Sequence, residues 1–193
     1  MNEHHARVCP SPEWQEHMQT VILPRLTQSC DLGEEMLEVG PGPGATTDWL
    51  RHRVKRLTAV EIEPDAAVKL RDRFADDDRV VVLDGDATRL PFADDTFDSA
   101  GSFTMLHHVP TERQQNAVLA EILRVLRPGG VLIASDSLAS TQLHEFHIDD
   151  TYNPIEPASL LPRLRTIGFD EVTVSVGRGL LFWAAKEQAT KEA

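Results

Sequence analysis

The sequence predicts an α/β fold: a doubly wound, mostly parallel seven-stranded sheet with an antiparallel C-terminal strand. Through residue 135, short apolar runs alternate with segments of helical periodicity, which is the pattern of βαβ units. The apolar run at 36–39 stops at a glycine-proline loop, G-P-G-P-G, and a helix-compatible segment follows. The tail reads instead as two strands around a glycine-containing turn at 177–179, and such a hairpin needs at least one antiparallel strand.

The individual elements follow from local signals. A helix begins at Ser11-Pro12, because serine is a favoured N-cap and proline fits the first turn, and Pro24 ends or kinks it. Strands are expected at 35–39, 56–61, 80–83, 97–103, 131–134, 169–176 and 180–185, and helices at 45–52 and 64–74. The clearest helix covers 111–126, where Thr111 and Gln114 form a capping box, and R-P-G-G at 127–130 ends it.

Length, charge and cysteine content restrict the classes of protein to which this chain can belong. A chain of 193 residues suits one domain, 1–193. Its net charge of −12 disfavours nucleic acid and membrane surfaces as partners. Cys9 and Cys30 form no C-x-x-C pair, which favours free thiols in a reducing compartment. No apolar leader or membrane-length run is present, so we expect a cytoplasmic protein.

The glycine-proline loop is suited to holding a small molecule. Glycines at 40, 42 and 44 allow backbone conformations closed to other residues, and the prolines between them stiffen the loop. The spacing of Gly40, Gly42 and Ala45 also fits the G-x-G-x-x-A pattern of dinucleotide folds. Glu38, however, would face a pyrophosphate unfavourably, whereas a carboxylate favours the sulfonium and ammonium of S-adenosylmethionine (SAM).

Three motifs resemble those of class I SAM-dependent methyltransferases, whose sheet is Rossmann-like. E-V-G-P-G-P-G resembles their motif I, and V-E-I-E-P resembles motif II, in which an acid (here Glu61, with Glu63 as a rival) accepts hydrogen bonds from the ribose. L-D-G-D-A resembles the adenine motif and implies Asp86 with Ala87, the alternative being a turn capped by the aspartate. F-D at 97–98 and L-R-P-G-G add to this resemblance. It implies SAM as cofactor and S-adenosylhomocysteine as product, held by Glu38, Gly40, Pro41, Gly42, Gly44, Glu61, Ile62, Asp86, Ala87 and Ser102.

The segment after the strand at 97–103 bears on the methyl acceptor. It reads T-M-L-H-H and not the N-P-P-Y or D-P-P-Y of enzymes that methylate base amines or glutamine amides. L-H-H resembles the small-molecule branch, such as the methyltransferases of ubiquinone and menaquinone biosynthesis. His107 is the candidate general base, or alternatively a histidine that orders the loop. The expected substrate contacts are Trp14, Phe103, His107, Phe146 and Tyr152.

The resemblance also assigns two flanking segments. Residues 1–30 form an N-terminal helical cap, in which Trp14 either covers the SAM pocket or packs the helix on the sheet, and 137–158 lies on the substrate side. His144 and His147 would share a helix face, but without a further spaced ligand they are weak evidence for zinc, so we predict no metal. Other classes stay open: a SAM-binding protein without catalysis, a partner-dependent subunit, or a nicotinamide-dependent oxidoreductase.

Overall fold

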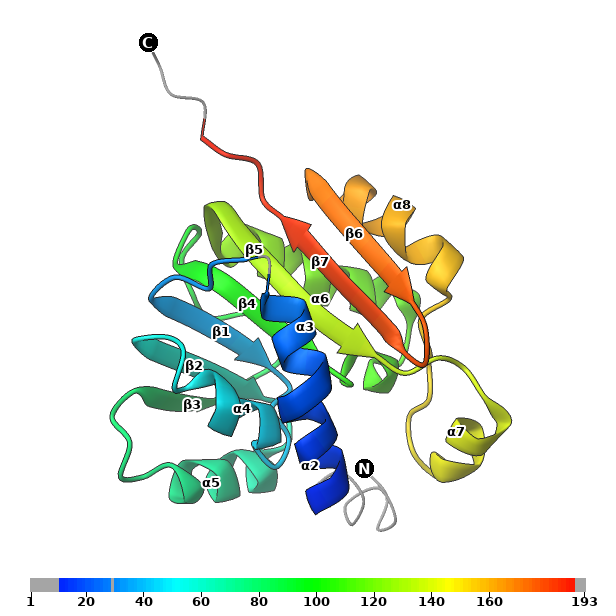
Figure 1. The fold of residues 1–193 in the computed structure, drawn as a ribbon, viewed down its shortest axis with the longest axis horizontal. Coiled ribbons are helices and arrows are strands. Elements are labelled where there is room, and N and C mark those ends of the chain that lie inside the picture. Colours follow the sequence, from blue (N-terminus) through cyan, green and yellow to red (C-terminus); the bar gives the residue numbers. More distant parts are fainter. Residues whose placement is uncertain (1–10, 29, 190–193) are drawn as a thin grey trace.

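The computed structural model describes residues 11–28 and 30–189 and contains the predicted sheet (Figure 1). Its seven strands are ordered β3-β2-β1-β4-β5-β7-β6, with β7 antiparallel to both of its neighbours and the other pairs parallel. Within the described ranges, no helix has the length and apolar character needed to cross a membrane. Cys30 is a free thiol, as expected, while Cys9 lies outside the described residues.

The elements run in chain order as follows. The N-terminal helix is continuous over α2 (Pro12–His17), a π-helical turn (Met18–Ile22) and α3 (Leu23–Thr27). The α/β part comprises β1 (Glu35–Val39), α4 (Ala45–Leu50), β2 (Arg56–Glu61), α5 (Pro64–Arg73), β3 (Val80–Asp84), β4 (Phe97–Phe103), a 3₁₀ turn (Leu106–His108), α6 (Glu112–Val125) and β5 (Leu126–Asp136). The last part comprises α7 (Thr141–Phe146), α8 (Pro157–Ile167), β6 (Glu171–Val176) and β7 (Leu180–Ala185).

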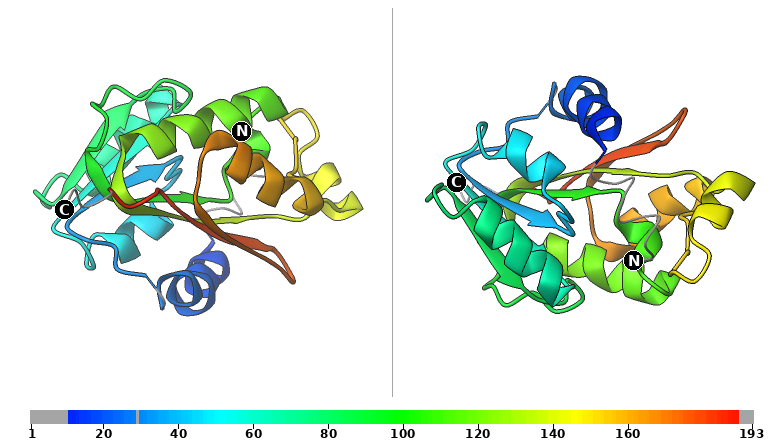
Figure 2. Two further views of the ribbon diagram at one scale, coloured as in Figure 1. Left: turned by 90° about the horizontal axis from the view of Figure 1, so that it is seen from above. Right: turned by 90° about the horizontal axis from the view of Figure 1, so that it is seen from below.

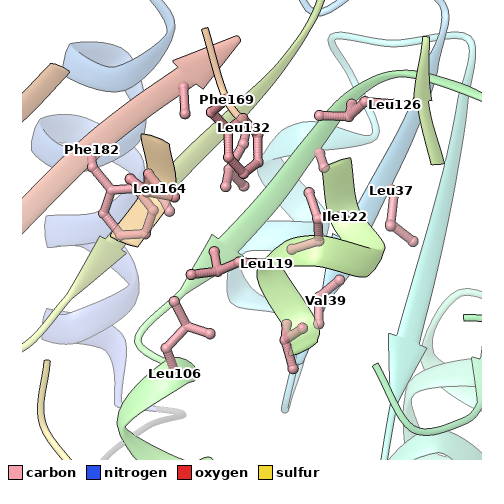
Figure 3. Packing of buried hydrophobic residues seen from close by; sticks show 14 of the residues in the cluster. Leu37, Val39, Leu106, Leu119, Ile122, Leu126, Leu132, Leu164, Phe169 and Phe182 are labelled. Carbon is pink, nitrogen blue, oxygen red and sulfur yellow. The ribbon is translucent and has the colours of Figure 1, made fainter. Parts of the chain in front are cut away.

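Helices cover both faces of the sheet (Figure 2). Because successive side chains of a strand point to opposite faces, Leu37 and Val39 of β1 join the core under α6 and α8, whereas Met36 joins the core under the N-terminal helix and α4. Figure 3 shows the first of these cores, with Leu119 and Ile122 of α6 among its fully buried members. The same alternation directs Glu38, two residues after Met36, toward α4.

The N-terminal helix shows how Pro24 is accommodated. Ser11 caps its start by accepting the Trp14 N–H at 3.3 Å, as predicted. Proline has no N–H and its ring displaces the carbonyl one turn back. The preceding turn widens into a π-helix in which Leu23 N–H donates to the carbonyl of Met18, so the helix continues through Pro24. Pro24 therefore coincides with a local irregularity and does not end the helix.

Two boundaries differ from the sequence-based expectation. β5 begins at Leu126, directly after α6, and not at residue 131, because the R-P-G-G segment continues as extended chain with a register shift against β4. Helix α8 was not expected, since Pro157 and Pro162 weaken the helical signal. Burial of Leu160 and Leu164, one turn apart, stabilises it against the core.

The F-D and L-R-P-G-G motifs share one structural role. The Asp98 carboxylate accepts the backbone N–H groups of Glu34 and Glu35, each at 2.9 Å, and forms an ion pair with Arg127. These contacts tie the segment before β1 to β4 and β5. The two motifs therefore fix the amino ends of the strands, at the edge of the sheet opposite the glycine loop.

Candidate active site

The glycine loop connects the carboxyl end of β1 to α4. Gly40, Gly42 and Gly44 have φ values of +67°, +53° and +85°, a region that side-chain residues rarely adopt. A Cβ at Gly40 would lie 2.2 Å from Met105 Cγ, and one at Gly44 would lie 2.4 Å from Leu70 Cδ1, whereas one at Gly42 would meet nothing within 4 Å. Packing therefore requires the outer two glycines, and the middle one leaves bare backbone facing open space.

Glu38 lies beneath this loop with 1% of its surface exposed. Its two carboxylate oxygens accept the hydroxyl groups of Thr46 and Thr47 at the start of α4, the latter at 2.6 Å. Burial raises the pKa of Glu38 from 4.5 to about 7, an effect that the two hydroxyl hydrogen bonds oppose and the charge of Glu61 reinforces. The side chain is thus a buried acid that can change its charge near neutrality when a cation approaches.

Glu61 ends β2 next to the loop and is also buried. Its Oε2 accepts the Gly42 N–H at 3.0 Å and its Oε1 accepts the Glu63 N–H at 3.1 Å. A carboxylate offers about four acceptor positions, so each oxygen can still receive a hydroxyl proton. Glu63, two residues further along the chain, is exposed and is the N-cap residue of α5. Glu61 is therefore the acid that contacts the glycine loop.

The remaining predicted cofactor residues lie along the same edge of the sheet. Asp86, exposed beyond β3, accepts the Thr88 N–H at 2.8 Å in a turn, so the capped-turn alternative describes its local geometry. Its other oxygen takes no part in that hydrogen bond, and Ala87 is half-buried beside it. Ile62 is 61% exposed after β2, and Ser102 is buried in β4, paired with Val39.

His107 lies in the 3₁₀ turn after β4 and is 3% exposed. Its Nδ1 lies 2.5 Å from Oδ1 of Asp136, and its backbone N–H donates to Oδ2 of the same residue at 3.2 Å. Asp136 also accepts the Ser137 N–H at 2.7 Å. Because both oxygens of Asp136 already accept backbone N–H groups, we assign the proton of this contact to Nδ1 of His107, which leaves the lone pair on Nε2.

The segment after β5 folds back over this turn. Asn153 donates its backbone N–H to the His107 carbonyl at 2.8 Å and its amide to the Val109 carbonyl at 2.9 Å. Gln115 of α6 donates to the carbonyls of Leu106, at 3.0 Å, and Asn153, at 2.8 Å. These contacts hold the expected substrate-side segment, which carries α7, beyond the carboxyl end of β5 (Figure 1).

The predicted substrate contacts divide into two places. Tyr152 stacks on His147 with ring centroids 5.0 Å apart, and Phe146 meets the same ring at 5.3 Å, so both lie in the segment near His107. Phe103 is instead buried in the core under the N-terminal helix, where the half-buried Trp14 also packs. Of the two alternatives for Trp14, its position supports packing of the helix on the sheet.

The histidines group differently from the pairing considered in the sequence. His144 is exposed and contacts the Tyr152 ring at 5.5 Å, while His147 is buried against His107 and His108. One ring nitrogen or equivalent ligand atom from each of His107, His108 and His147 lies within 4.8 Å of the others. The sequence paired His147 with His144, whereas its ring neighbours in the structure lie about 40 residues earlier in the chain.

Two important groups were not recognised in the sequence. Asp136 is the last residue of β5, two positions after its apolar run, and an acid at the carboxyl end of a parallel strand is the signal that could have identified it. Thr46 and Thr47 were not recognised as the partners of Glu38, although they occupy the first turn of the helix after the loop. Gln19 likewise donates to the Ala45 carbonyl at 3.0 Å and joins the N-terminal helix to that turn.

The sheet order, the glycine loop after β1 and the acids along the carboxyl edge define a class I SAM-dependent methyltransferase fold. The chain belongs to the family described as "Methyltransferase domain", which matches residues 37–134. This match confirms the resemblance drawn from the three motifs.

Individual proteins agree with this assignment. A "Probable S-adenosylmethionine-dependent methyltransferase" of Mycolicibacterium smegmatis is 29% identical over 82% of this chain and 61% of its own length. "Phthiotriol/phenolphthiotriol dimycocerosates methyltransferase 1" of Mycobacterium ulcerans is 30% identical over 77% of the chain and 51% of its own length. The "putative methyltransferase" solved with the Haloferax volcanii Trm112 activator superposes with a TM-score of 0.76 at 18% identity, covering 97% of this chain and 99% of that one. The chain thus spans about half to three fifths of the length of these two curated relatives.

Proposed function

We propose that the protein binds SAM and transfers its methyl group to a small-molecule acceptor by in-line displacement. The observation that carries this proposal is the row of acids, Glu38, Glu61 and Asp86, along the carboxyl edge of three adjacent parallel strands around the glycine loop. Such a row suits a cationic nucleoside with hydroxyl and amine donors, and it is unfavourable for a pyrophosphate.

Each part of the cofactor has a proposed partner. Glu38 and the loop of Gly40, Pro41, Gly42 and Gly44 bind the methionine end, and Ser102 lies beside them in β4. Glu61 binds the ribose diol through the acceptor positions that its two backbone contacts leave. Asp86 and Ala87 bind the adenine amine and ring nitrogen, with the exposed Ile62 against the adenine ring.

The chemistry needs alignment more than acid-base catalysis. In the displacement the S–CH₃ bond breaks as the bond from the methyl carbon to the acceptor atom forms, and neutral S-adenosylhomocysteine leaves with the electron pair. A protonated nucleophile must also lose its proton. His107 is the proposed base, since the hydrogen bond from its Nδ1 to Asp136 leaves Nε2 to accept that proton.

Three features of the chain support a small molecule as the methyl acceptor: its net charge, the sequence after β4 and two aromatic side chains near His107. A net charge of −12 repels nucleic acid, and the turn after β4 carries L-H-H where base-amine methyltransferases carry N-P-P-Y. Phe146 and Tyr152 would contact an apolar or aromatic acceptor near His107. The relative from Mycobacterium ulcerans is, by its name, a methyltransferase of phthiotriol and phenolphthiotriol dimycocerosates. A cytoplasmic location is part of the proposal, in keeping with the free thiol of Cys30.

Calorimetry followed by a transfer assay tests this function. We expect SAM and S-adenosylhomocysteine to bind with one site per chain, and NAD not to bind. Protein incubated with methyl-labelled SAM should then label at least one member of a panel of quinols, phenols and polyketide alcohols, with bulk RNA as a separate arm. NAD binding in place of SAM would overturn the cofactor assignment. SAM binding with no labelled product in any arm would overturn catalysis, and labelling of RNA alone would overturn the acceptor class.

A further inference from the structure

Three histidine rings converge at the edge of the proposed acceptor site. The His107 and His108 ring centroids are 4.1 Å apart, and His147 lies 5.0 Å from the first and 5.1 Å from the second. One potential ligand atom from each lies within 4.8 Å of the others. His107 and His147 are each 3% exposed, whereas His108 is half-buried.

The fold positions these rings from two separate segments. His107 and His108 lie in the 3₁₀ turn after β4, and His147 caps the carboxyl end of α7. The hydrogen bonds of Asn153 described above tie the two segments together on either side of the cluster. The three rings are therefore held by backbone contacts and do not meet only through flexible side chains.

In two of these rings, Nδ1 forms a hydrogen bond of the kind that metal-binding histidines make with their non-coordinating nitrogen. Nδ1 of His107 donates to the Asp136 carboxylate at 2.5 Å, and Nδ1 of His147 donates to the Leu143 carbonyl at 2.7 Å. A carbonyl oxygen can only accept, so Nδ1 of His147 must be the protonated nitrogen. Both contacts place the lone pair on Nε2. Carboxylate and carbonyl acceptors of this kind fix the tautomer and orientation of metal-binding histidines.

We propose that His107, His108 and His147 together bind one divalent transition-metal ion, with zinc as the preferred occupant. Three imidazole ligands without a carboxylate in the set favour zinc, cobalt or nickel over magnesium or calcium, which require oxygen ligands. Nitrogens around tetrahedral zinc lie about 3.4 Å apart, given Zn–N distances near 2.1 Å. The widest separation here is at most 4.8 Å, so binding of the ion would require the rings to rotate until their nitrogens approach that value.

The consequence for the acceptor rests on the proposed function, whereas metal binding itself does not. Within the described residues the cluster supplies three ligands, and an acceptor oxygen would be the fourth ligand of tetrahedral zinc, as in catalytic zinc sites. An acceptor hydroxyl bound there would lose its proton to solvent more readily and attack the methyl carbon as an alkoxide. With metal bound, Nε2 of His107 acts as a ligand, and the metal replaces it in activating the acceptor.

The test measures metal binding in full-length protein prepared without a histidine tag and stripped with EDTA. Zn²⁺ is titrated against a chromophoric chelator, and Co²⁺ is added separately, because four-coordinate Co²⁺ absorbs strongly in the visible range. Since the chain contains eight histidines, His144→Ala is the matched control: it removes a histidine from α7, one turn before His147, that is outside the cluster. Each variant is checked by circular dichroism.

We expect the native protein and His144→Ala to bind one equivalent of Zn²⁺ with equal affinity and to give the same cobalt spectrum. His147→Ala and, independently, the less buried His108→Ala should each weaken binding at least about 100-fold, because each removes one ligand of three. Equal affinity of the native protein and a folded His147→Ala or His108→Ala variant would overturn the site, as would no zinc binding at all. Calorimetry with SAM on the same samples separates the hypotheses: SAM binding without zinc binding refutes the metal site alone, and zinc binding without SAM binding refutes the cofactor assignment alone.

Discussion

The buried carboxyl of Glu38 makes the stability of the free protein depend on pH, and Glu38→Gln should remove that dependence. Its pKa is 4.5 when solvated and about 7 in the fold. A group whose pKa is raised by folding contributes its stability fully below the unfolded pKa and loses it as the pH rises through the folded pKa. The loss from Glu38 therefore extends from about pH 4.5 to above pH 7.

The size of this loss follows from the two pKa values. A tenfold change in proton affinity corresponds to about 1.4 kcal/mol, so the full contribution of Glu38 is on the order of 3 kcal/mol, and most of it is lost between pH 5 and pH 8. Glutamine matches the protonated acid in shape. Its amide can accept from one of Thr46 and Thr47 and donate to the other, so the variant keeps both contacts without a buried charge.

Chemical denaturation at pH 5 and pH 8 measures the effect, with thermal unfolding as a second readout. Relative to Glu38→Gln, the wild-type protein should lose about 2–3 kcal/mol more between these values, or about 5–10 °C in melting temperature. The exposed Glu63→Gln is the control and should follow the wild-type curve. If the free energy of unfolding of the wild type and of Glu38→Gln changed equally between pH 5 and pH 8, the reasoning would be refuted. That result would mean that ionisation of the Glu38 carboxyl does not destabilise the fold.

Three further predictions concern the loop and the site. Glu61→Ala should weaken SAM binding by roughly 1–3 kcal/mol in calorimetry, since the ribose hydroxyls lose their acceptor. His107→Ala should lower kcat about 100-fold or more in the transfer assay while SAM affinity stays nearly unchanged, because the proposed role of the ring is to take the proton of the acceptor and not to bind the cofactor. Gly40→Ala should destabilise the protein more than Gly42→Ala in denaturant unfolding. Both incur about 1–2 kcal/mol of backbone strain, but only the first places a Cβ against Met105.

Each of these predictions has an outcome that contradicts it. Unchanged SAM affinity in Glu61→Ala would remove the motif II assignment, and equal turnover in His107→Ala would remove that histidine from the chemistry. If Gly42→Ala unfolds more readily than Gly40→Ala, the close approach of a Cβ at Gly40 to Met105 does not determine the loss of stability. Normal stability with weakened SAM binding in Gly42→Ala would instead agree with bare backbone facing the cofactor.

Much of the sheet and the cofactor side was predictable from the sequence because its signals are local. The apolar run of β1, the glycine loop and the acid ending β2 lie within about 25 residues, and parallel strands bring such ends together by construction. The alternating pattern of β6, followed by a glycine-containing turn and the apolar run of β7, likewise predicted the antiparallel hairpin. Helix α8 was missed since its two prolines oppose helix formation, and only burial of Leu160 and Leu164 against the core overcomes that preference.

The acceptor side depends on contacts that no local pattern encodes. Asp136 meets His107 because β4 and β5 are neighbours in the sheet, so residues 29 positions apart share one hydrogen bond. His147 joins His107 and His108 because Asn153 and Gln115 hold the returning chain against the turn after β4. The sequence by itself determined the strands, the glycine loop and the row of acids, whose spacing is set by the geometry of a strand and a turn. Only the tertiary structure decided which histidines face one another, since that depends on the path of a long connection fixed by distant hydrogen bonds.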